Sequence, residues 1–187
     1  MNNIAIIYKS NYGSTETYAK WLAQELGADL LQTDRIKPAD LQKYQTIVYG
    51  GGLYAGGVNG LGLLTKNFEC IKDKRIYIFT VGAADVTDPE NTNAIRNSLE
   101  KTLPSAMWEA VHIYHLRGGM YYSKMSFAHR TMMNMMVRML RKKPESELCN
   151  DEIAMISTFG QDTDFTDRTT IAPLVADIKA YWGEKTQ

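Results

Sequence analysis

The stretch SNYGST gathers hydroxyl and amide side chains around one glycine, directly before a segment with helical spacing. Its members are Ser10, Asn11, Tyr12, Gly13, Ser14 and Thr15. A helix N-terminus presents free backbone N–H groups and about half a positive charge. The hydroxyls add donors, and the glycine lets the backbone turn closely around a ligand. This set predicts a site for a phosphate monoester that needs no lysine or arginine.

The same stretch differs from the phosphate loop of nucleoside triphosphatases, which has the pattern G-x-x-x-x-G-K-[ST]. Residues 10–15 contain no lysine that could reach the terminal phosphates, so nucleoside triphosphate hydrolysis is disfavoured. A simpler alternative stays open, in which Gly13 is only a turn residue and the hydroxyls only cap the helix.

Two further loops stand where predicted strands end, YGGGLYAGG at residues 49–57 and TVGAAD at residues 80–85. Ligands of open α/β sheets bind beyond the carboxyl ends of the strands, so the three loops predict one shared site. The candidates from these two loops are Gly50, Gly51, Gly52, Leu53, Tyr54, Ala55, Gly56, Thr80, Val81, Gly82 and Ala83. Residues 50–55 also fit the dinucleotide pattern G-x-G-x-x-[GA], but that match is weak because further glycines follow where a helix should begin.

Strands and helices alternate along the chain, which predicts an α/β fold with a parallel sheet and helices on both of its faces. The predicted strands are residues 3–8, 28–33, 46–51, 75–82 and 108–116. The predicted helices are residues 14–26, 60–71, 88–103 and 166–182. Asp88 is expected as an N-cap with Pro89 at the first helical position, and Pro173 is expected to bend the last helix or to move its start.

The composition favours one domain, residues 1–187, because 44% of the residues are hydrophobic and 22% are charged. No apolar run reaches the roughly 18 residues of a membrane span, and no signal peptide is expected, so the predicted location is cytoplasmic. Cys70 and Cys149 lie in no metal or redox spacing, which indicates two reduced thiols. The three histidines, His112, His115 and His129, likewise form no metal-ligand or nucleophile–base pattern, so no metal is expected.

Residues 117–150 interrupt the alternation and are predicted as an insertion that carries one helix, about residues 123–142. Residues 117–143 hold seven basic residues, no acidic residue and seven of the ten methionines, although the whole chain has no net charge. Such a bias is typical of a contact surface. The methionines form a stripe at helical spacing, which either packs against the sheet or offers a surface to a membrane or a protein partner. No recognition motif for nucleic acid is present, so none is expected as a partner.

The loop SNYGST resembles the phosphate loop of flavodoxins, written [ST]-x-T-G-x-T, with Ser10, Gly13 and Thr15 at matching positions. The resemblance implies a flavodoxin-like fold, five parallel strands in the order 2-1-3-4-5, and FMN as the cofactor. It also implies that the loop binds the FMN phosphate and that residues 49–57 and 80–85 surround the flavin ring. Tyr54 is then expected on or beside the flavin, and the alternative is an ordinary packed loop tyrosine.

The insertion is similar in character to that of the menaquinone-dependent protoporphyrinogen oxidases, a branch of flavodoxin-like proteins. That resemblance implies an FMN-dependent oxidoreductase coupled to a quinone, with Arg117, Tyr121 and Tyr122 meeting the substrate or the acceptor. The alternative is a non-catalytic carrier that passes electrons between protein partners. A third hypothesis, an interaction module without flavin, rests on Tyr12, which stands where the flavodoxin pattern has a threonine.

The basic insertion also predicts a property of a bound flavin. The two-electron-reduced flavin can be an anion, and nearby cations such as Arg117 favour the charged form. We therefore expect a higher midpoint potential than in ordinary flavodoxins, whose surroundings are acidic.

Overall fold

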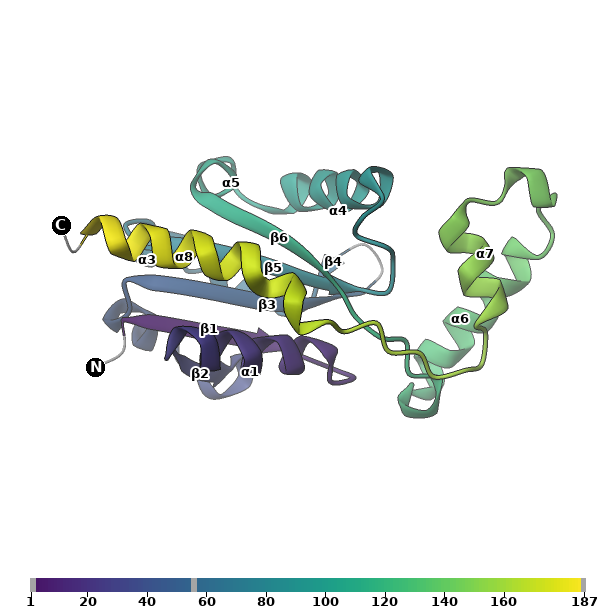
Figure 1. Ribbon diagram of the computed structural model, residues 1–187, viewed down its shortest axis with the longest axis horizontal. Helices are drawn as coiled ribbons and strands as arrows, with labels where there is room; N and C mark the ends of the chain where they lie inside the picture. Colours follow the sequence, from purple (N-terminus) through teal and green to yellow (C-terminus); the bar gives the residue numbers. More distant parts are fainter. Residues whose placement is uncertain (1–2, 55–56, 186–187) are drawn as a thin grey trace.

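A central parallel sheet organises the molecule, and the computed structural model describes residues 3–54 and 57–185 of the chain (Figure 1). Ala55 and Gly56, two of the predicted site residues, lie outside the described residues. The parallel strands stand in the order β2-β1-β3-β5-β6. Their bounds are β1 Ile4–Lys9, β2 Asp29–Gln32, β3 Thr46–Tyr54, β5 Arg75–Gly82 and β6 Val111–Arg117. If only the five parallel strands are numbered along the chain, without the antiparallel β4, their order is the predicted 2-1-3-4-5.

The inner strands are buried on both sides, which explains their continuous apolar runs. In β1 the residues Ala5, Ile6 and Ile7 are fully buried, and they stand opposite β3 in register, with Ile6 beside Val48. Because side chains alternate between the two faces of a strand, this packing divides into two clusters, one on each face.

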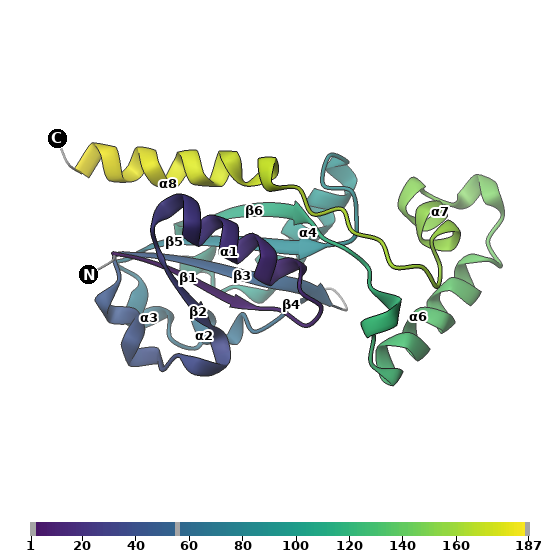
Figure 2. The same ribbon diagram turned by 60° about the horizontal axis from the view of Figure 1, so that its bottom comes forward.

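Helices cover both faces of the sheet (Figure 2). One cluster joins the sheet to helix α1 (Ser14–Leu26) and helix α8 (Ala172–Lys185), for example through Leu22 and Leu174. The other cluster joins it to α2 (Gly62–Thr65), α3 (Phe68–Ile71), α4 (Pro89–Thr102) and α5 (Ser105–Ala110).

Two signals at helix ends are confirmed. Asp88 accepts a hydrogen bond from the backbone N–H of Glu90 at 2.9 Å, so it caps α4 as predicted. Helix α8 begins at Ala172, directly before Pro173, because a proline is tolerated only in the first turn.

The predicted elements differ from the structure in several places. The single helix predicted at residues 60–71 is two short helices, α2 and α3, separated at residues 66–67. The strand predicted from residue 108 begins at Val111, because α5 occupies the preceding residues. Strand β3 continues three residues beyond the predicted end and pairs with a short antiparallel strand, β4 (Gly57–Val58).

After β6 the chain leaves the sheet and forms a separate lobe, here called the arm (residues 118–166), beyond the carboxyl ends of the strands (Figure 1). The arm contains α6 (Phe127–Leu140) and also α7 (Asn150–Ser157), which packs against α6 and was not predicted. The excursion therefore continues past residue 150, the predicted end of the insertion. Its outgoing and returning segments pair through two backbone hydrogen bonds between Met120 and Thr163, at 2.8 and 2.9 Å.

One tyrosine of α1 fastens both ends of the arm to the sheet. The Tyr18 hydroxyl donates to the carbonyl oxygen of Arg117 at 2.7 Å, and it accepts from the backbone N–H of Asp167 at 3.0 Å. Tyr18 itself is fully buried under α8. The arm is thus a lobe with a fixed base.

The methionine stripe of α6 does not pack against the sheet face, which excludes one of the two alternatives for it. The buried side chains of α6 are Met133, Val137 and Leu140, whereas Phe127 is 88% exposed and Met135 61% exposed. Neither core cluster contains a residue of the arm within the described chain.

Cys70 and Cys149 are both exposed free thiols. Within residues 3–54 and 57–185, none of the helices has the length and apolar character needed to cross a bilayer.

Candidate functional site

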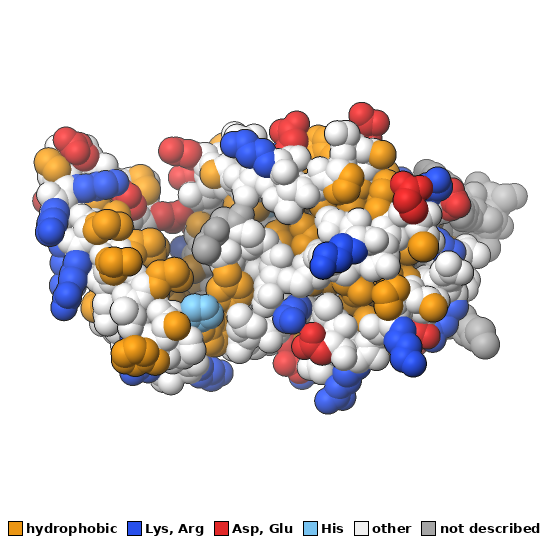
Figure 3. Space-filling view, turned by 180° about the vertical axis from the view of Figure 1, so that it is seen from behind, with side chains coloured by type: hydrophobic (Ala, Val, Ile, Leu, Met, Phe, Trp, Pro, Cys, Tyr) orange, Lys and Arg blue, Asp and Glu red, His pale blue; other side chains and the backbone are white. Residues whose placement is uncertain are grey.

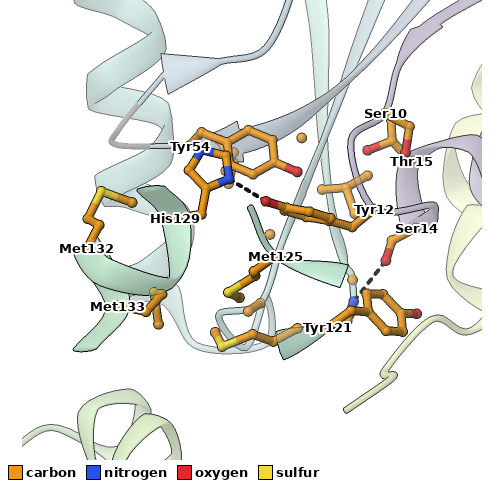
Figure 4. A pocket seen from close by; sticks show the side chains of 18 of the residues that line it. Ser10, Tyr12, Ser14, Thr15, Tyr54, Tyr121, Met125, His129, Met132 and Met133 are labelled. Carbon is orange, nitrogen blue, oxygen red and sulfur yellow. Dashed lines mark hydrogen bonds between the residues drawn. The ribbon is translucent and has the colours of Figure 1, made fainter. Parts of the chain in front are cut away.

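A cavity of about 280 Å³ lies where the sheet body meets the arm (Figure 4). The loop after β1, the ends of β3 and β5, and the segment after β6 form its sheet side, and α6 with the residues before it forms the opposite wall. The cavity therefore stands beyond the carboxyl ends of the strands, where the three predicted loops converge. The sheet body contributes Ser10, Tyr12, Ser14, Thr15, Gly52, Leu53, Tyr54, Val81, Gly82 and Ala83.

The loop after β1 presents an uncapped helix N-terminus to this cavity. Gly13 is the N-cap of α1 with φ of 110°, and it has no side chain to cap the helix. Ser14 and Thr15, in the first turn, are buried and line the cavity. The Ser10 hydroxyl oxygen accepts from the backbone N–H of Gly13 at 3.1 Å, which leaves the Ser10 hydrogen available to donate. This end of the cavity is therefore a donor-rich pocket without a cation, as an anion site at a helix N-terminus requires.

Two residues of the predicted loop, Asn11 and Gly13, do not line the cavity. Gly13 does not line the cavity but provides the positive φ that turns the chain into α1. Asn11 faces Asn59, whose side-chain amide donates to the Asn11 carbonyl oxygen at 3.1 Å. This bond ties the loop after β1 to the chain after β4.

Glycine backbones let the walls of the cavity approach closely. A Cβ added at Gly52 would lie 2.8 Å from the Tyr54 ring, and one added at Gly82 would lie 2.8 Å from Leu53. A Cβ added at Gly118 would lie 2.6 Å from Val81 and 3.1 Å from the Ser14 Cβ. A side chain at any of these positions would force a neighbouring side chain to shift, so glycine allows the walls of the cavity to pack at close range.

Three predicted residues of the second and third loops do not line the cavity. Gly50 lies inside β3 against the Phe79 ring, and Gly51 lies against Val58 and Asn59. Thr80 is fully buried in β5, and its hydroxyl bonds to His115 Nδ1 at 2.8 Å. Burial lowers the pKa of His115. Since β3 continues through Tyr54, the loop begins later than the sequence predicts, and Gly50 and Gly51 become sheet residues.

The three residues proposed for the substrate are separated by the structure. Tyr121 lines the cavity, with its pKa raised by burial and by a hydrogen bond to Asp164. Tyr122 lies under α6 outside this cavity, packed edge-on against Phe159 at 5.4 Å between ring centroids. Arg117 is turned away from the cavity, because its guanidinium pairs with Asp85 at 3.0 Å and lies over the Phe165 ring at 4.2 Å.

Of the wall contributed by the arm, only Tyr121 was predicted as part of the site. The wall consists of Gly118, Gly119, Met120, Tyr121, Met125, His129, Met132, Met133 and Met136. The methionine stripe was the available signal, and it is part of this apolar wall. Methionine side chains adapt to the shape of an apolar ligand, so the wall suits a hydrophobic ring system.

His129 joins the arm to two loops of the sheet body. Its Nδ1 atom is hydrogen-bonded to the Tyr12 hydroxyl (Figure 4). Its ring also stacks on the Tyr54 ring, with 5.7 Å between centroids and 12° between planes. Tyr12 and Tyr54 meet edge-on at 6.0 Å. The three rings form an aromatic cluster (Tyr12, Tyr54 and His129) that closes one side of the cavity.

The lining residues include no carboxylate, amine, guanidinium or thiol in the described chain. Burial raises the pKa of Tyr54 to about 12, and the neighbouring Tyr12 adds to the shift. The Tyr54 phenol therefore stays protonated at neutral pH. The described residues also include no group of three His, Cys, Asp or Glu side chains close enough to hold a metal ion. The cavity therefore has a donor-rich end at the first turn of α1 and an apolar, aromatic chamber, an arrangement that suits an organic ligand with an anionic group.

A family model described as a flavodoxin domain matches residues 5–147 of the chain. Among curated proteins, an uncharacterized protein of Methanocaldococcus jannaschii, MJ0298, is 40% identical over 52 residues. The match covers 27% of this chain and 35% of that protein, so the chain spans about a third of that relative's length.

The solved structures to which this chain is similar include three flavoproteins of low sequence identity. A putative flavoprotein from Bacteroides eggerthii is 13% identical, covering 62% of this chain and 86% of that one, with a TM-score of 0.43. A flavoprotein from Lactobacillus acidophilus, crystallised with FMN, is 13% identical over 63% of this chain and 93% of that one, with a TM-score of 0.42. Oxidised flavodoxin 2 from Bacillus cereus is 16% identical, covering 62% of this chain and 84% of that one, with a TM-score of 0.41.

Proposed function

Because the chain belongs to the flavodoxin domain family, we propose that it is an oxidoreductase that binds FMN and passes electrons to a small-molecule acceptor. The observation that carries the proposal is the cavity itself, which combines an uncapped helix N-terminus with an apolar chamber closed by the arm. A carrier that serves only protein partners does not need an apolar chamber of this kind beside its cofactor.

FMN fits the two ends of the cavity. Its phosphate is suited to the first turn of α1, where the hydroxyls of Ser10, Ser14 and Thr15 surround free backbone N–H groups. Its ring is suited to the apolar part of the cavity, which Gly52, Gly82 and Tyr54 line. Bound FMN supplies the redox chemistry, and the protein supplies binding, orientation and exclusion of water.

The chemistry of the arm wall favours a hydrophobic acceptor of the quinone class. Five methionines of the arm line the cavity, and no charged side chain of the described lining opposes an apolar ring; they are Met120, Met125, Met132, Met133 and Met136. Oxidation of protoporphyrinogen coupled to quinone reduction is the more specific form of this proposal. Of the three residues expected to meet the substrate or the acceptor, only Tyr121 lines the cavity, so the support for a quinone comes from the apolar wall of the arm.

Electron transfer between protein partners is the alternative function. The wide exposure of Phe127, Met135 and Met139 on the arm favours it, because such a surface suits transient protein contact. The two functions separate in one assay, since a carrier transfers electrons rapidly to a redox protein and poorly to a quinone.

The decisive experiment is a titration of the purified protein with FMN, followed by anaerobic reduction and mixing with a water-soluble naphthoquinone. We expect stoichiometric FMN binding, rapid reoxidation by the quinone, and a midpoint potential above that of ordinary flavodoxins. The potential is expected to be high because the cavity lining has no carboxylate, and because residues 117–143, which include the wall formed by α6, hold seven basic residues and no acidic one. Absence of FMN binding contradicts the cofactor assignment, and slow reoxidation with a very low potential supports the carrier.

The arm also offers a surface to an anionic membrane at the cytoplasmic face, where lipid-soluble quinones are found. Its exposed apolar side chains include Phe127, Met132, Met135, Met139 and Ile153, and Figure 3 shows apolar groups on this lobe with Lys and Arg along its outer edge. Sedimentation with vesicles of anionic lipid tests this contact. We expect wild type to bind, Phe127→Glu to bind several-fold more weakly, and Lys66→Glu, which alters an exposed charge on the sheet body, to behave as wild type.

A further inference from the structure

We infer that His129 is the catalytic acid of this site, the group that gives a proton to the reduced acceptor, and that Tyr12 is its positioning residue. The inference rests on the proposed function, and it concerns a residue that the sequence motifs did not indicate. It is carried by the place of His129 in the cavity and by its contacts with two loops of the sheet body.

His129 is held from two directions. The Tyr12 hydroxyl bonds to Nδ1, and the Tyr54 ring stacks on the imidazole plane. A hydroxyl can donate to Nδ1 of the neutral imidazole and can accept from Nδ1–H of the protonated one, so the bond survives a change of charge. In the protonated ring Nδ1–H is used by Tyr12, which leaves the Nε2–H as the acidic group for a ligand.

Within the described lining, His129 is the single imidazole, the side-chain type that most often transfers protons in catalysis. The other titratable groups that face the cavity are the phenols Tyr12, Tyr54 and Tyr121. Tyr54 keeps its proton up to about pH 12 because it is buried. The nearest cation of α6, Arg130, is directed outside the cavity and donates to the carbonyl oxygen of Tyr122 at 2.9 Å. No competing proton donor for neutral pH is thus present among these groups.

The step balances with the groups named. A quinone becomes a hydroquinone when it gains two electrons and two protons. Reduced, anionic FMN, when bound, would supply both electrons and one proton together as a hydride, and protonated His129 would give the second proton from Nε2. The products are oxidised FMN, the hydroquinone and a neutral imidazole, and the charges cancel on both sides. His129 is partly exposed beside Met132, which is 41% exposed, so solvent can return the proton.

The test compares two acceptors in one protein. A naphthoquinone needs the proton, whereas ferricyanide takes one electron and needs none. We expect His129→Gln to slow reoxidation by the naphthoquinone by about 100-fold and to leave ferricyanide reoxidation within twofold of wild type. The rate with naphthoquinone should fall at alkaline pH in wild type, and this dependence should be absent in the variant. His112→Gln, the same change at a histidine of β6 that pairs with Asp177, should behave as wild type.

A purely structural role of His129 predicts a different result. Loss of the contact between the arm and the sheet body would then slow reoxidation by both acceptors equally, or would lower the affinity for FMN. An FMN fluorescence titration of His129→Gln is therefore included, and an unchanged dissociation constant is expected. Nitrogen NMR of the imidazole provides a readout without turnover, since Tyr12→Phe should shift the Nδ1 signal of His129. Equal naphthoquinone rates in wild type and His129→Gln overturn the inference. Failure of the proposed function is seen separately, as a wild type that does not bind FMN or does not react with quinone.

Discussion

The sheet body and the arm differ in how their residues are held. In the sheet body, large side chains such as Tyr49, Phe79 and Leu22 are fully buried in two clusters that enclose the strands. In the arm, most of α6 is exposed, and its methionines divide between the cavity wall and the surface. We infer from this difference that the sheet body positions the proposed anion pocket, whereas the arm selects the ligand that binds beside it.

The link between the two regions is small and specific. The Tyr18 hydroxyl fixes the base of the arm, and the aromatic cluster of Tyr12, Tyr54 and His129 joins its α6 to the loops of the sheet body. Neither contact belongs to a hydrophobic cluster shared by the two regions within the described chain. Changes in the arm are therefore expected to alter the reaction more than the stability, and changes in the body to do the reverse.

Removal of the arm is the largest test of this division. Met120 and Thr163 are paired across the base, so a short Gly-Ser turn can replace residues 121–162. We expect the body to keep its circular dichroism spectrum and cooperative unfolding, while quinone reduction falls about 1,000-fold, because orientation and proton transfer are both lost. An unfolded product contradicts the independence of the body.

The anion pocket is the second test. Gly13 has φ of 110°, with space for a side chain but a backbone conformation that valine strains strongly. We expect Gly13→Val to weaken FMN binding about 100-fold, because the loop must leave the position that exposes the N-terminus of α1. The matched control is Gly27→Val at the other end of α1, where φ is 57°. Fluorescence titration should show normal affinity in the control, and undiminished affinity in Gly13→Val refutes the pocket.

Packing in the sheet body is the third test. A Cβ at Gly50 would overlap the ring of Phe79, which is fully buried. We expect Gly50→Ala to lower the free energy of unfolding by about 2 kcal/mol in urea titrations. Met135→Ala, at an exposed arm position, should change it by less than about 0.5 kcal/mol. Equal losses from the two variants remove the distinction between body and arm.

An acid titration is the smallest test. Burial opposes ionisation of Asp177, but hydrogen bonds from Tyr114 at 2.8 Å and Tyr77 at 3.1 Å outweigh it and hold its pKa below the usual range. A lowered pKa stabilises the fold above the unfolded value of about 3.9, and this stability is lost as the pH falls through the lower folded value. In urea titrations, the free energy of unfolding should fall less between pH 7 and pH 3 for Asp177→Asn than for wild type. Asp162→Asn in the arm should change the pH dependence of the unfolding free energy less than Asp177→Asn does. If Asp177→Asn has the same pH dependence as wild type, the lowered pKa of Asp177 does not contribute to the acid sensitivity of the fold.

The amino-acid sequence by itself determined the strands of the parallel sheet, the hydroxyl-rich loop before α1 and the helix ends, whereas the order of the strands came from the resemblance to flavodoxins. These features depend on short-range patterns, such as the apolar runs of β1 and β5, the Asp88–Pro89 cap, and the hydroxyls around Gly13. Each acts within a few residues, so local periodicity and turn chemistry are sufficient to predict it.

Only the tertiary structure decided the second wall of the site. Tyr12 and His129 are 117 residues apart, and no local pattern pairs them. Arg117 lies at a strand end in the sequence, yet Asp85 and Phe165 hold it outside the cavity. The methionine stripe was compatible with a sheet-packed helix or a surface, and it became a cavity wall because Tyr18 fixes where the arm leaves and returns. Amphipathic spacing shows that a face needs a partner, and the path of the whole chain determines which partner it meets.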